Sequence, residues 1–468
     1  MMINRGLLYD APKDKLRHDA LMALQRDFFP NHAARDTKGM ELELPIIHAR
    51  DDNTRTCESL LPQEMLGLLR KISLDNPLYE MSNDGMKLVY RPDPQRTIGT
   101  DVGSGLLEIT TAPAIKIRDI ETQLRAVLAE VLYVAEKSGF YVLGYGGHPA
   151  SEPSRELLMP FQRTKAINNL LDIDTSTVLL TTIASVQTHN AVGMDNLIRF
   201  YNAMNGAAPA MIAISGNSPI LAGKDTYYSD YRSQVWNSCG SSFRVHKEAN
   251  MGRVGIPPRF GNYEEYWKWM VSFTPMFTER DGHLIMFEGP ESMSRYMSDG
   301  IAYGLRVGDW KRIAITPTVE DILIHEGSSL WTEARIKSIL GTVEGRTFPA
   351  QTTLSGNLST LAFSTGLLAN LNEAEDRIYA YTVEDARASR EHSSLFGVHG
   401  DIAHGSAIEY AKDVLEIAKR GLAQDEKAYL EPLMEMAEDH TAPSDLARAV
   451  YGARGIAGLI EHIKLRID

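Results

Sequence analysis

Residues 39–47, GMELELPII, place two glutamates two positions apart inside an otherwise apolar run. If this segment is a strand, successive side chains point to opposite faces, so Glu41 and Glu43 share one face and Leu42 lies on the other. Such a pair of carboxylates has two explanations. It can be the solvated face of an antiparallel strand, or it can hold metal ions on the wall of a site.

Three other segments show the same alternation of apolar and polar residues, and each is predicted to be a strand. Their ranges are 104–111, 183–190 and 341–348. The residues on their polar faces are Glu108 in the first, Gln187 and His189 in the second, and Glu344 and Arg346 in the third. Carboxylates and imidazole are ligands for Mg²⁺ or Mn²⁺ beside nucleotide phosphates, and a guanidinium group can neutralise a phosphoryl group. The spacing alone does not make these strands neighbours.

Composition limits the classes of function. The chain has 468 residues, 43% of them hydrophobic, and a formal net charge of -13. This balance is typical of a globular protein, and it argues against nucleic acid as a partner because no basic stripe is present. Cys57 and Cys239 cannot form a disulfide framework. The N-terminal residues show no signal-peptide pattern and no apolar run is long enough to span a membrane, so we expect a cytoplasmic protein.

Helices are predicted from apolar residues at 3.6-residue spacing. One covers residues 118–138 and ends before Gly139, which stands where a C-terminal cap belongs. A second is expected to start at Asp195 as its N-cap and to run toward Met211. A third has its apolar stripe between residues 408 and 422.

These elements predict an α+β fold built on a largely antiparallel sheet, with helices on its outer, apolar face. No linker of Pro, Gly and Ser divides the chain, so we expect one catalytic domain over residues 1–468. Within it, residues 38–350 would form the sheet and helices of the active site. Residues 400–468 would form a helical C-terminal extension.

Seven motifs occur in the order and at the approximate spacing of the family-2 glutamate-cysteine ligases, which the chain therefore resembles. The motifs are GMELEL, LLEITTAP, GYGGHP, SVQTHNAVGMDNLIRFYNAM, SGNSPILAGKDTYYSDYRSQVW, PPRFGNYEEY and GTVEGRTF. The resemblance covers residues 38 to 350 and continues more weakly through EDARASREHSSLFG. That family consists of carboxylate-amine ligases of the glutamine synthetase-like superfamily. The resemblance implies a sheet that forms a funnel-shaped active site.

The resemblance also implies roles for individual residues. The implied metal ligands are Glu41, Glu43, Glu108, His189 and Glu344. The implied catalytic residues are Glu41, Arg335 and Arg346, and those near the bound nucleotide are Gln187, His189 and Arg346, with Arg346 as the phosphate clamp. The implied substrate-pocket residues are Arg232, Arg335 and Thr111.

The chain departs from the family pattern at two places. Where many members have a glutamate before the L-E-x-x-T strand, this chain offers Asp101 or Ser104. After the E-x-R strand it has Phe348, Pro349 and Gln351 in place of a frequent aspartate. We expect both places to lie near the substrates, so that the amine acceptor, or the acid, differs from the family's usual one.

The implied activity is ATP-dependent amide formation with Mg²⁺ or Mn²⁺, in which an acyl phosphate of glutamate reacts with cysteine or another amino acid. One alternative is a ligase that attaches an amino acid to a peptide or a specialised metabolite. Another is a phosphotransferase of the guanidino kinase type, and a third is a binding protein without turnover. The expected partners are small amino acids, with no membrane; the sequence leaves a homo-oligomer open.

Overall fold

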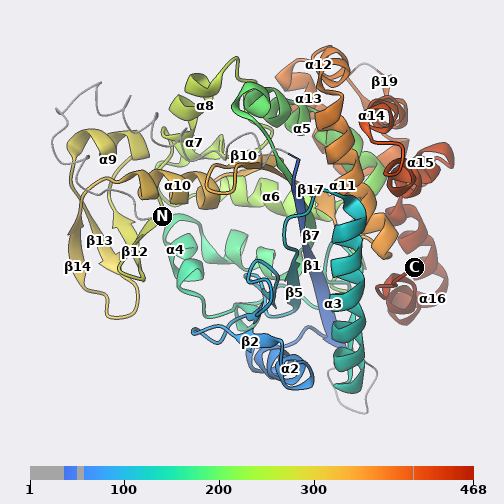
Figure 1. Cartoon of the computed structure of the whole chain (residues 1–468), viewed down its shortest axis with the longest axis horizontal. Coiled ribbons are helices and arrows are strands. Elements are labelled where there is room, and N and C mark those ends of the chain that lie inside the picture. Colours follow the sequence, from blue (N-terminus) through green and yellow to red (C-terminus); the bar gives the residue numbers. More distant parts are fainter. Residues whose placement is uncertain (1–35, 50–56, 404) are drawn as a thin grey trace.

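A computed structural model describes residues 36–49, 57–403 and 405–468 of the chain (Figure 1). The N-terminal segment used above to argue against a signal peptide lies outside these described residues. Within the described ranges, no helix combines the length and the apolar character needed to cross a membrane.

The four predicted strands lie side by side in one nine-stranded antiparallel sheet, as expected. They are β1 (Lys38–His48), β5 (Leu106–Thr110), β7 (Ser185–Ala191) and β17 (Thr342–Pro349). Their spatial order is β17-β7-β1-β5, so the N-terminal strand β1 pairs with partners from distant parts of the chain. The sheet therefore collects polar residues that are far apart in sequence.

The remaining strands extend this sheet in both directions. β16 (Ala334–Lys337) pairs with β17 at one edge. Beyond β5 come β4 (Thr97–Thr100), β3 (Leu88–Tyr90) and β2 (Tyr79–Met81), and β6 (Phe140–Val142) pairs with the end of β1.

Long helices cover the apolar face of the sheet, because alternation turns every second side chain of β1 away from the polar face. Leu42 and Leu44, for example, are fully buried. The covering helices are α3 (Ile117–Lys137), α5 (Met194–Ser215) and α11 (Leu354–Ala369), and α14 (Ala407–Gly421) packs against α5 and α11. In Figure 1, α3 and α11 stand to one side of the central strands.

The predicted helix boundaries are nearly correct. Gly139 follows α3 with φ +79°, a left-handed conformation that suits glycine at a C-terminal cap. The predicted N-cap at Asp195 is wrong, because α5 starts one residue earlier and Gly193 occupies the cap. Asp195 instead lies in the first turn, where a carboxylate is favoured by the helix dipole.

A second, four-stranded antiparallel sheet was not predicted. Its strands are β11 (Phe277–Arg280), β12 (His283–Glu288), β13 (Ala302–Arg306) and β14 (Arg312–Ile315). It packs with α9 (Met293–Asp299) and α10 (Val319–Ser329), and it lies at the left of Figure 1, well away from α3.

The other helices complete the layers around the two sheets. They are α2 (Pro62–Asp75), α4 (Gln162–Leu170), α6 (Tyr231–Ser241), α7 (Lys247–Met251), α8 (Tyr263–Met270), α12 (Leu371–Ile378), α13 (Val383–Phe396), α15 (Glu431–Glu438) and α16 (Pro443–Ile463). Short strand pairs are β8 (Ile220–Leu221) with β9 (Lys224–Asp225), β10 (Val254–Gly255) with β15 (Trp331–Thr332), and β18 (Asp401–Ile402) with β19 (Gly405–Ser406). The C-terminal segment is thus mostly helical.

Candidate metal and nucleotide site

The strand register brings the predicted polar residues together on one face. Glu41 lies opposite Gln187 on β7, and Glu43 lies opposite Glu108 on β5. On the other side of β7, Glu344 lies opposite His189. Because directly opposite residues point to the same face, the register alone makes these side chains neighbours.

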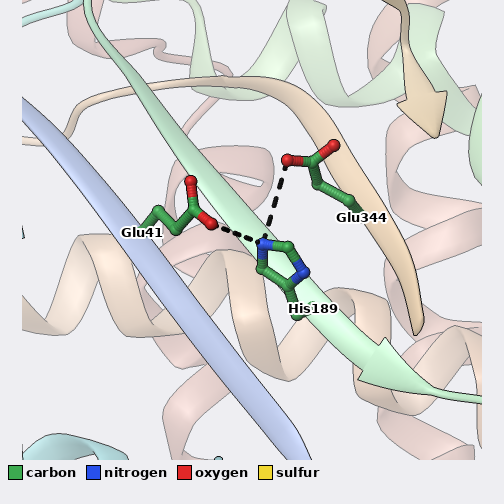
Figure 2. Close-up of side chains that lie close together, drawn as sticks. All are labelled: Glu41, His189 and Glu344. Carbon is green, nitrogen blue, oxygen red and sulfur yellow. Dashed lines mark ion pairs between the residues drawn. The ribbon is translucent and has the colours of Figure 1, made fainter. Parts of the chain in front are cut away.

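Glu41, His189 and Glu344 form a compact group of metal-binding type (Figure 2). His189 Nε2 lies 3.1 Å from Glu41 Oε1 and 3.8 Å from Glu344 Oε1. One ligand atom from each residue lies within 4.8 Å of the other two. Two carboxylates and an imidazole from three strands are a donor set that fits Mg²⁺ or Mn²⁺ beside phosphate.

Gln187 connects the second glutamate of β1 to the predicted phosphate clamp. Its Nε2 donates to Glu43 Oε1 at 2.5 Å, and its Oε1 accepts a hydrogen bond from Arg346 at 3.0 Å. The other oxygen of Glu43 accepts from the backbone and hydroxyl of Ser185, at 2.9 and 2.7 Å. The carboxylate and the guanidinium are therefore held in fixed positions by an amide between them.

Glu344 is surrounded by cationic groups and has no exposed surface. Arg335 donates to its two oxygens at 2.6 and 3.1 Å, Arg346 lies at 3.2 Å, and Lys337 Nζ lies at 3.8 Å. Burial favours the neutral acid, but Arg335, Lys337 and Arg346 outweigh it and hold the pKa of Glu344 well below its usual value. Glu344 is therefore a fixed negative charge.

The other acids are in a different electrostatic state. Burial, followed by the charge of Asp101, raises the pKa of Glu43 to about 7. Burial and then the charge of Glu41 raise the pKa of Glu108 well above its usual value. For Glu41, burial is outweighed by the hydrogen bond and charge of His189, so its pKa is lowered. Acids that repel one another in a buried place are what a bound cation would stabilise.

The three predicted substrate residues have structural contacts in the described chain. Arg232 donates to the carbonyl oxygens of Arg346 and Thr347 at 2.6 and 3.3 Å, and so supports β17. The hydroxyl of Thr111 accepts a hydrogen bond from the Met40 backbone at 2.9 Å. Arg335 directs its guanidinium at Glu344, as described above. Their contact with substrate stays a prediction.

Of the residues 348–351 expected near the substrates, Phe348 and Gln351 do not lie on the polar face. Pro349 does, because it lies opposite Ser185, whose hydroxyl donates to Glu43. The pairing of β17 with β7 is irregular between Gly345 and Phe348, and such a bulge shifts the side chains after it to the other face. Phe348 is fully buried and contacts the ring of Phe363 in the core. The buried amide of Gln351 donates to the carbonyls of Ser215 and Pro349 at 3.0 and 2.8 Å.

The two residues that replace the family's glutamate before β5, Asp101 and Ser104, have different environments. Ser104 is fully buried and its hydroxyl donates to the carbonyl of Leu60 at 2.6 Å, so it serves the fold. Asp101 is close enough to raise the pKa of both Glu43 and Glu108 by its charge, after the larger effect of burial. Asp101 is therefore the acid of this loop whose charge acts on the carboxylates of the polar face.

Sequence reasoning missed three charged residues beside the site. Lys337 was detectable, because alternation along β16 places it on the same face as Arg335. Glu333 and Arg390 form a buried ion pair next to Arg232. Burial lowers the pKa of Arg232, and the charges of Asp230 and then Glu333 partly offset that effect. That pair joins two segments 57 residues apart, so no local spacing could reveal it.

Comparison with known proteins gives a family assignment. The model of glutamate-cysteine ligase family 2 matches residues 37–461. A Rubrobacter xylanophilus protein, provisionally named glutamate–cysteine ligase 2-3, is 26% identical over 174 residues, which cover 37% of this chain and 44% of that protein. The chain therefore matches less than half the length of this relative.

Two further similarities extend over more of the chain. The chloroplastic glutamate–cysteine ligase of Solanum lycopersicum is 22% identical over 385 residues, covering 80% of this chain and 69% of that protein. The crystal structure of glutamate–cysteine ligase from Francisella tularensis in complex with AMP superposes with a TM-score of 0.56 at 12% identity. It covers 92% of this chain and 87% of that one, which shows a shared fold.

Proposed function

Because the chain belongs to glutamate-cysteine ligase family 2, we propose that it is an ATP-dependent carboxylate-amine ligase. Its acid substrate would be glutamate, activated at the γ-carboxyl group, and its amine substrate cysteine or another amino acid. The observation that carries the proposal is the convergence of Glu41, His189 and Glu344 from three strands. The AMP complex of the structural relative is consistent with a nucleotide in this fold.

A carboxylate needs activation before it reacts with an amine, since its leaving group would otherwise be oxide. ATP with divalent metal ions would supply the phosphoryl group that converts the carboxylate into an acyl phosphate. The amine nitrogen then attacks the acyl carbon, the C–O bond to phosphate breaks, and the nitrogen loses a proton. The chain's task is to position the reactants and to neutralise charge on the transferred phosphoryl group.

The described contacts assign these tasks to particular residues. Glu41, His189 and Glu344 would hold one cation, and the pair Glu43 and Glu108 would hold another. Arg346 would neutralise the phosphoryl oxygens, because it is already aimed across the same face by Gln187 and Glu344. Arg335 would act as a positioning residue that fixes Glu344.

The amine acceptor in this proposal is cysteine or another amino acid. Among the departures from the family pattern, Phe348, Gln351 and Ser104 make structural contacts in the core, whereas Asp101 and Pro349 lie beside the acidic face. A peptide or metabolite acceptor stays an alternative.

Incubation of the purified chain with ATP, Mg²⁺, glutamate and a panel of amines tests the proposal through ADP release and new amide. We expect both products with at least one amino acid. Glu41→Gln should abolish ADP release while the melting temperature stays unchanged. Glu80→Gln is the matched control, because Glu80 lies on the same sheet in an exposed pair with Arg91.

Each other result has a definite meaning. Phosphorylated substrate without amide would favour a phosphotransferase. No ADP release with any amine would favour a binding protein. Full activity in Glu41→Gln would remove the acidic face from the mechanism.

A further inference from the structure

A pocket of about 400 Å³ lies against α5, on the side of this helix away from the sheet. It is bounded by α5, the loop after Gly255 and α12, and its walls include Ile198, Phe260 and Tyr379. Met204 of the same helix faces the opposite way, toward Gly345 of β17. The helix and the sheet thus separate this pocket from the acidic face.

Two arginines line the pocket, but only one of them is neutralised. Arg199 donates from Nε to Glu375 Oε2 at 2.9 Å and from its NH2 group to Asn372 at 2.7 Å. Arg259 lies 4.0 Å above the centre of the Tyr379 ring and donates to the Tyr381 carbonyl at 2.8 Å. In the described parts of the chain, no carboxylate lies within ion-pair distance of Arg259.

Arg259 is held in place by these two contacts and has a guanidinium edge left for a ligand. One NH2 group is used by the Tyr381 carbonyl, and the ring of Tyr379 covers one face. A guanidinium that is already oriented binds a carboxylate through two parallel hydrogen bonds at little entropic cost. The pocket has one positive charge in excess, counting Arg199, Arg259 and Glu375, so an anion is favoured over a cation.

The walls beside Arg259 favour an organic anion over an inorganic one. Ile198 and Phe260 line the pocket, and the ring of Tyr379, which is 38% exposed, adds aromatic surface to its wall. Concave sites with mostly apolar walls and a few fixed polar groups are typical of small organic ligands. We propose that this pocket binds a small carboxylate with an apolar or aromatic body, its carboxylate on Arg259 and its body against Ile198 and Phe260.

Either a simple carboxylic acid or a free amino acid carries this chemistry. The two differ at the ammonium group, for which Glu375 offers Oε1. That oxygen has only a long contact of 3.5 Å, from the Tyr379 hydroxyl, whereas Oε2 is used by Arg199. An amino acid is therefore accommodated, but its amine is not required.

Titration calorimetry of the full chain without ATP tests this proposal with three probe molecules of similar size, each with a phenyl ring. These are 3-phenylpropionate, L-phenylalanine and phenethylamine. We expect one or both of the carboxylates to bind and the amine, which lacks a carboxylate, to bind at least tenfold more weakly. Tighter binding of L-phenylalanine would identify an amino acid as the ligand class, and tighter binding of 3-phenylpropionate a simple acid.

Variants locate the binding. Arg259→Met should weaken binding of the carboxylate by about tenfold or more, because charge-assisted hydrogen bonds are lost. Arg259→Lys keeps the positive charge but not the planar guanidinium that makes two parallel hydrogen bonds, so we expect an intermediate loss of affinity. This result separates a loss of recognition from misfolding. Arg118→Met, at an exposed arginine on α3, is the control and should bind like the wild type.

The proposal is overturned if neither carboxylate binds, if phenethylamine binds as tightly as they do, or if Arg259→Met binds them unchanged. None of these results depends on the ligase reaction, since the measurement contains no nucleotide. ADP release by Arg259→Met should match that of the wild type, because Arg259 is not part of the acidic face.

Discussion

Two buried groups of charged residues in this chain differ in how completely their charges are matched. The buried carboxylate of Asp321, in the first turn of α10, accepts hydrogen bonds from several donor groups. Arg280 donates to its two oxygens at 2.7 and 2.8 Å, and Tyr296 and the Thr318 backbone each donate at 2.9 Å. The hydroxyl of Thr278 donates as well.

On the polar face of the main sheet, by contrast, carboxylates face one another. Glu43 and Glu108 are directly opposite across two strands, and both have raised pKa values, first because of burial and then because of neighbouring acids. A carboxylate that is hydrogen-bonded to donors on every side stabilises the packing of the elements that supply them, here α9, α10 and β11. The repulsion among Glu43, Glu108 and Asp101 in a buried place costs stability and indicates a place for a ligand.

The strongest test of this difference is Asp321→Asn. It removes the carboxylate that neutralises Arg280, which is only 24% exposed, and breaking a buried pair costs about 3–5 kcal/mol. We expect a large fall in the denaturant midpoint. Glu288→Gln breaks an exposed pair with Arg312 and should cost less than about 1 kcal/mol. Equal effects of the two substitutions would contradict the distinction.

The pH dependence of stability tests the acidic face directly. The pKa of Glu43 is raised from 4.5 to about 7, so between these pH values the folded state binds more protons at Glu43 than the unfolded state does. The stability that this protonation contributes is therefore lost as the pH rises from 4.5 to about 7. In metal-free buffer, the wild type should lose about 3 kcal/mol relative to Glu43→Gln across that window. Denaturation curves of both proteins at a series of pH values measure this. Parallel pH profiles would show that the face is not electrostatically strained.

Glu108→Gln separates stability from activity. The pKa of Glu108 is raised well above its usual value by burial and then by Glu41, so a neutral amide resembles the form that the metal-free fold favours. We expect an unchanged or higher melting temperature and a fall in ADP release of about 100-fold. Glu80→Gln should change neither quantity. A melting temperature that falls together with activity would give Glu108 a structural role.

The smallest expected effect concerns Lys337. Its ammonium group lies 3.8 Å from Glu344 and opposes a metal ion there by charge. Lys337→Met should therefore bind Mn²⁺ about tenfold more tightly in the absence of nucleotide, which electron paramagnetic resonance can measure. Lys268→Met, in an exposed helical pair with Glu264, is the control. Weaker Mn²⁺ binding in Lys337→Met would place this lysine outside the site's electrostatics.

The faces of the main strands were predictable because alternation is a local property. Glu41 and Glu43, and likewise Gln187 and His189, share a face as their spacing requires. That these strands are neighbours was not predictable from spacing, since β1 pairs with β5, β6 and β7, which come from distant parts of the chain. The family resemblance supplied that step.

Local irregularities and long-range pairs explain what was missed. One bulge in β17 was enough to move Phe348 from the expected site to the core. Gly193 rather than Asp195 caps α5, because a capping preference does not fix a helix boundary to a single residue. The ion pair of Glu333 with Arg390 depends on the folded arrangement of α13 and the residue between β15 and β16.

In the proposed function, carboxylates and a histidine from separate strands hold divalent ions beside a nucleotide. Anomalous diffraction from crystals grown with Mn²⁺ and a non-hydrolysable ATP analogue tests it most directly. We expect a manganese peak within about 2.5 Å of ligand atoms from Glu41, His189 or Glu344 and of a phosphate oxygen. A bound nucleotide whose metal ions contact none of the acidic residues of β1, β5 and β17 would contradict it.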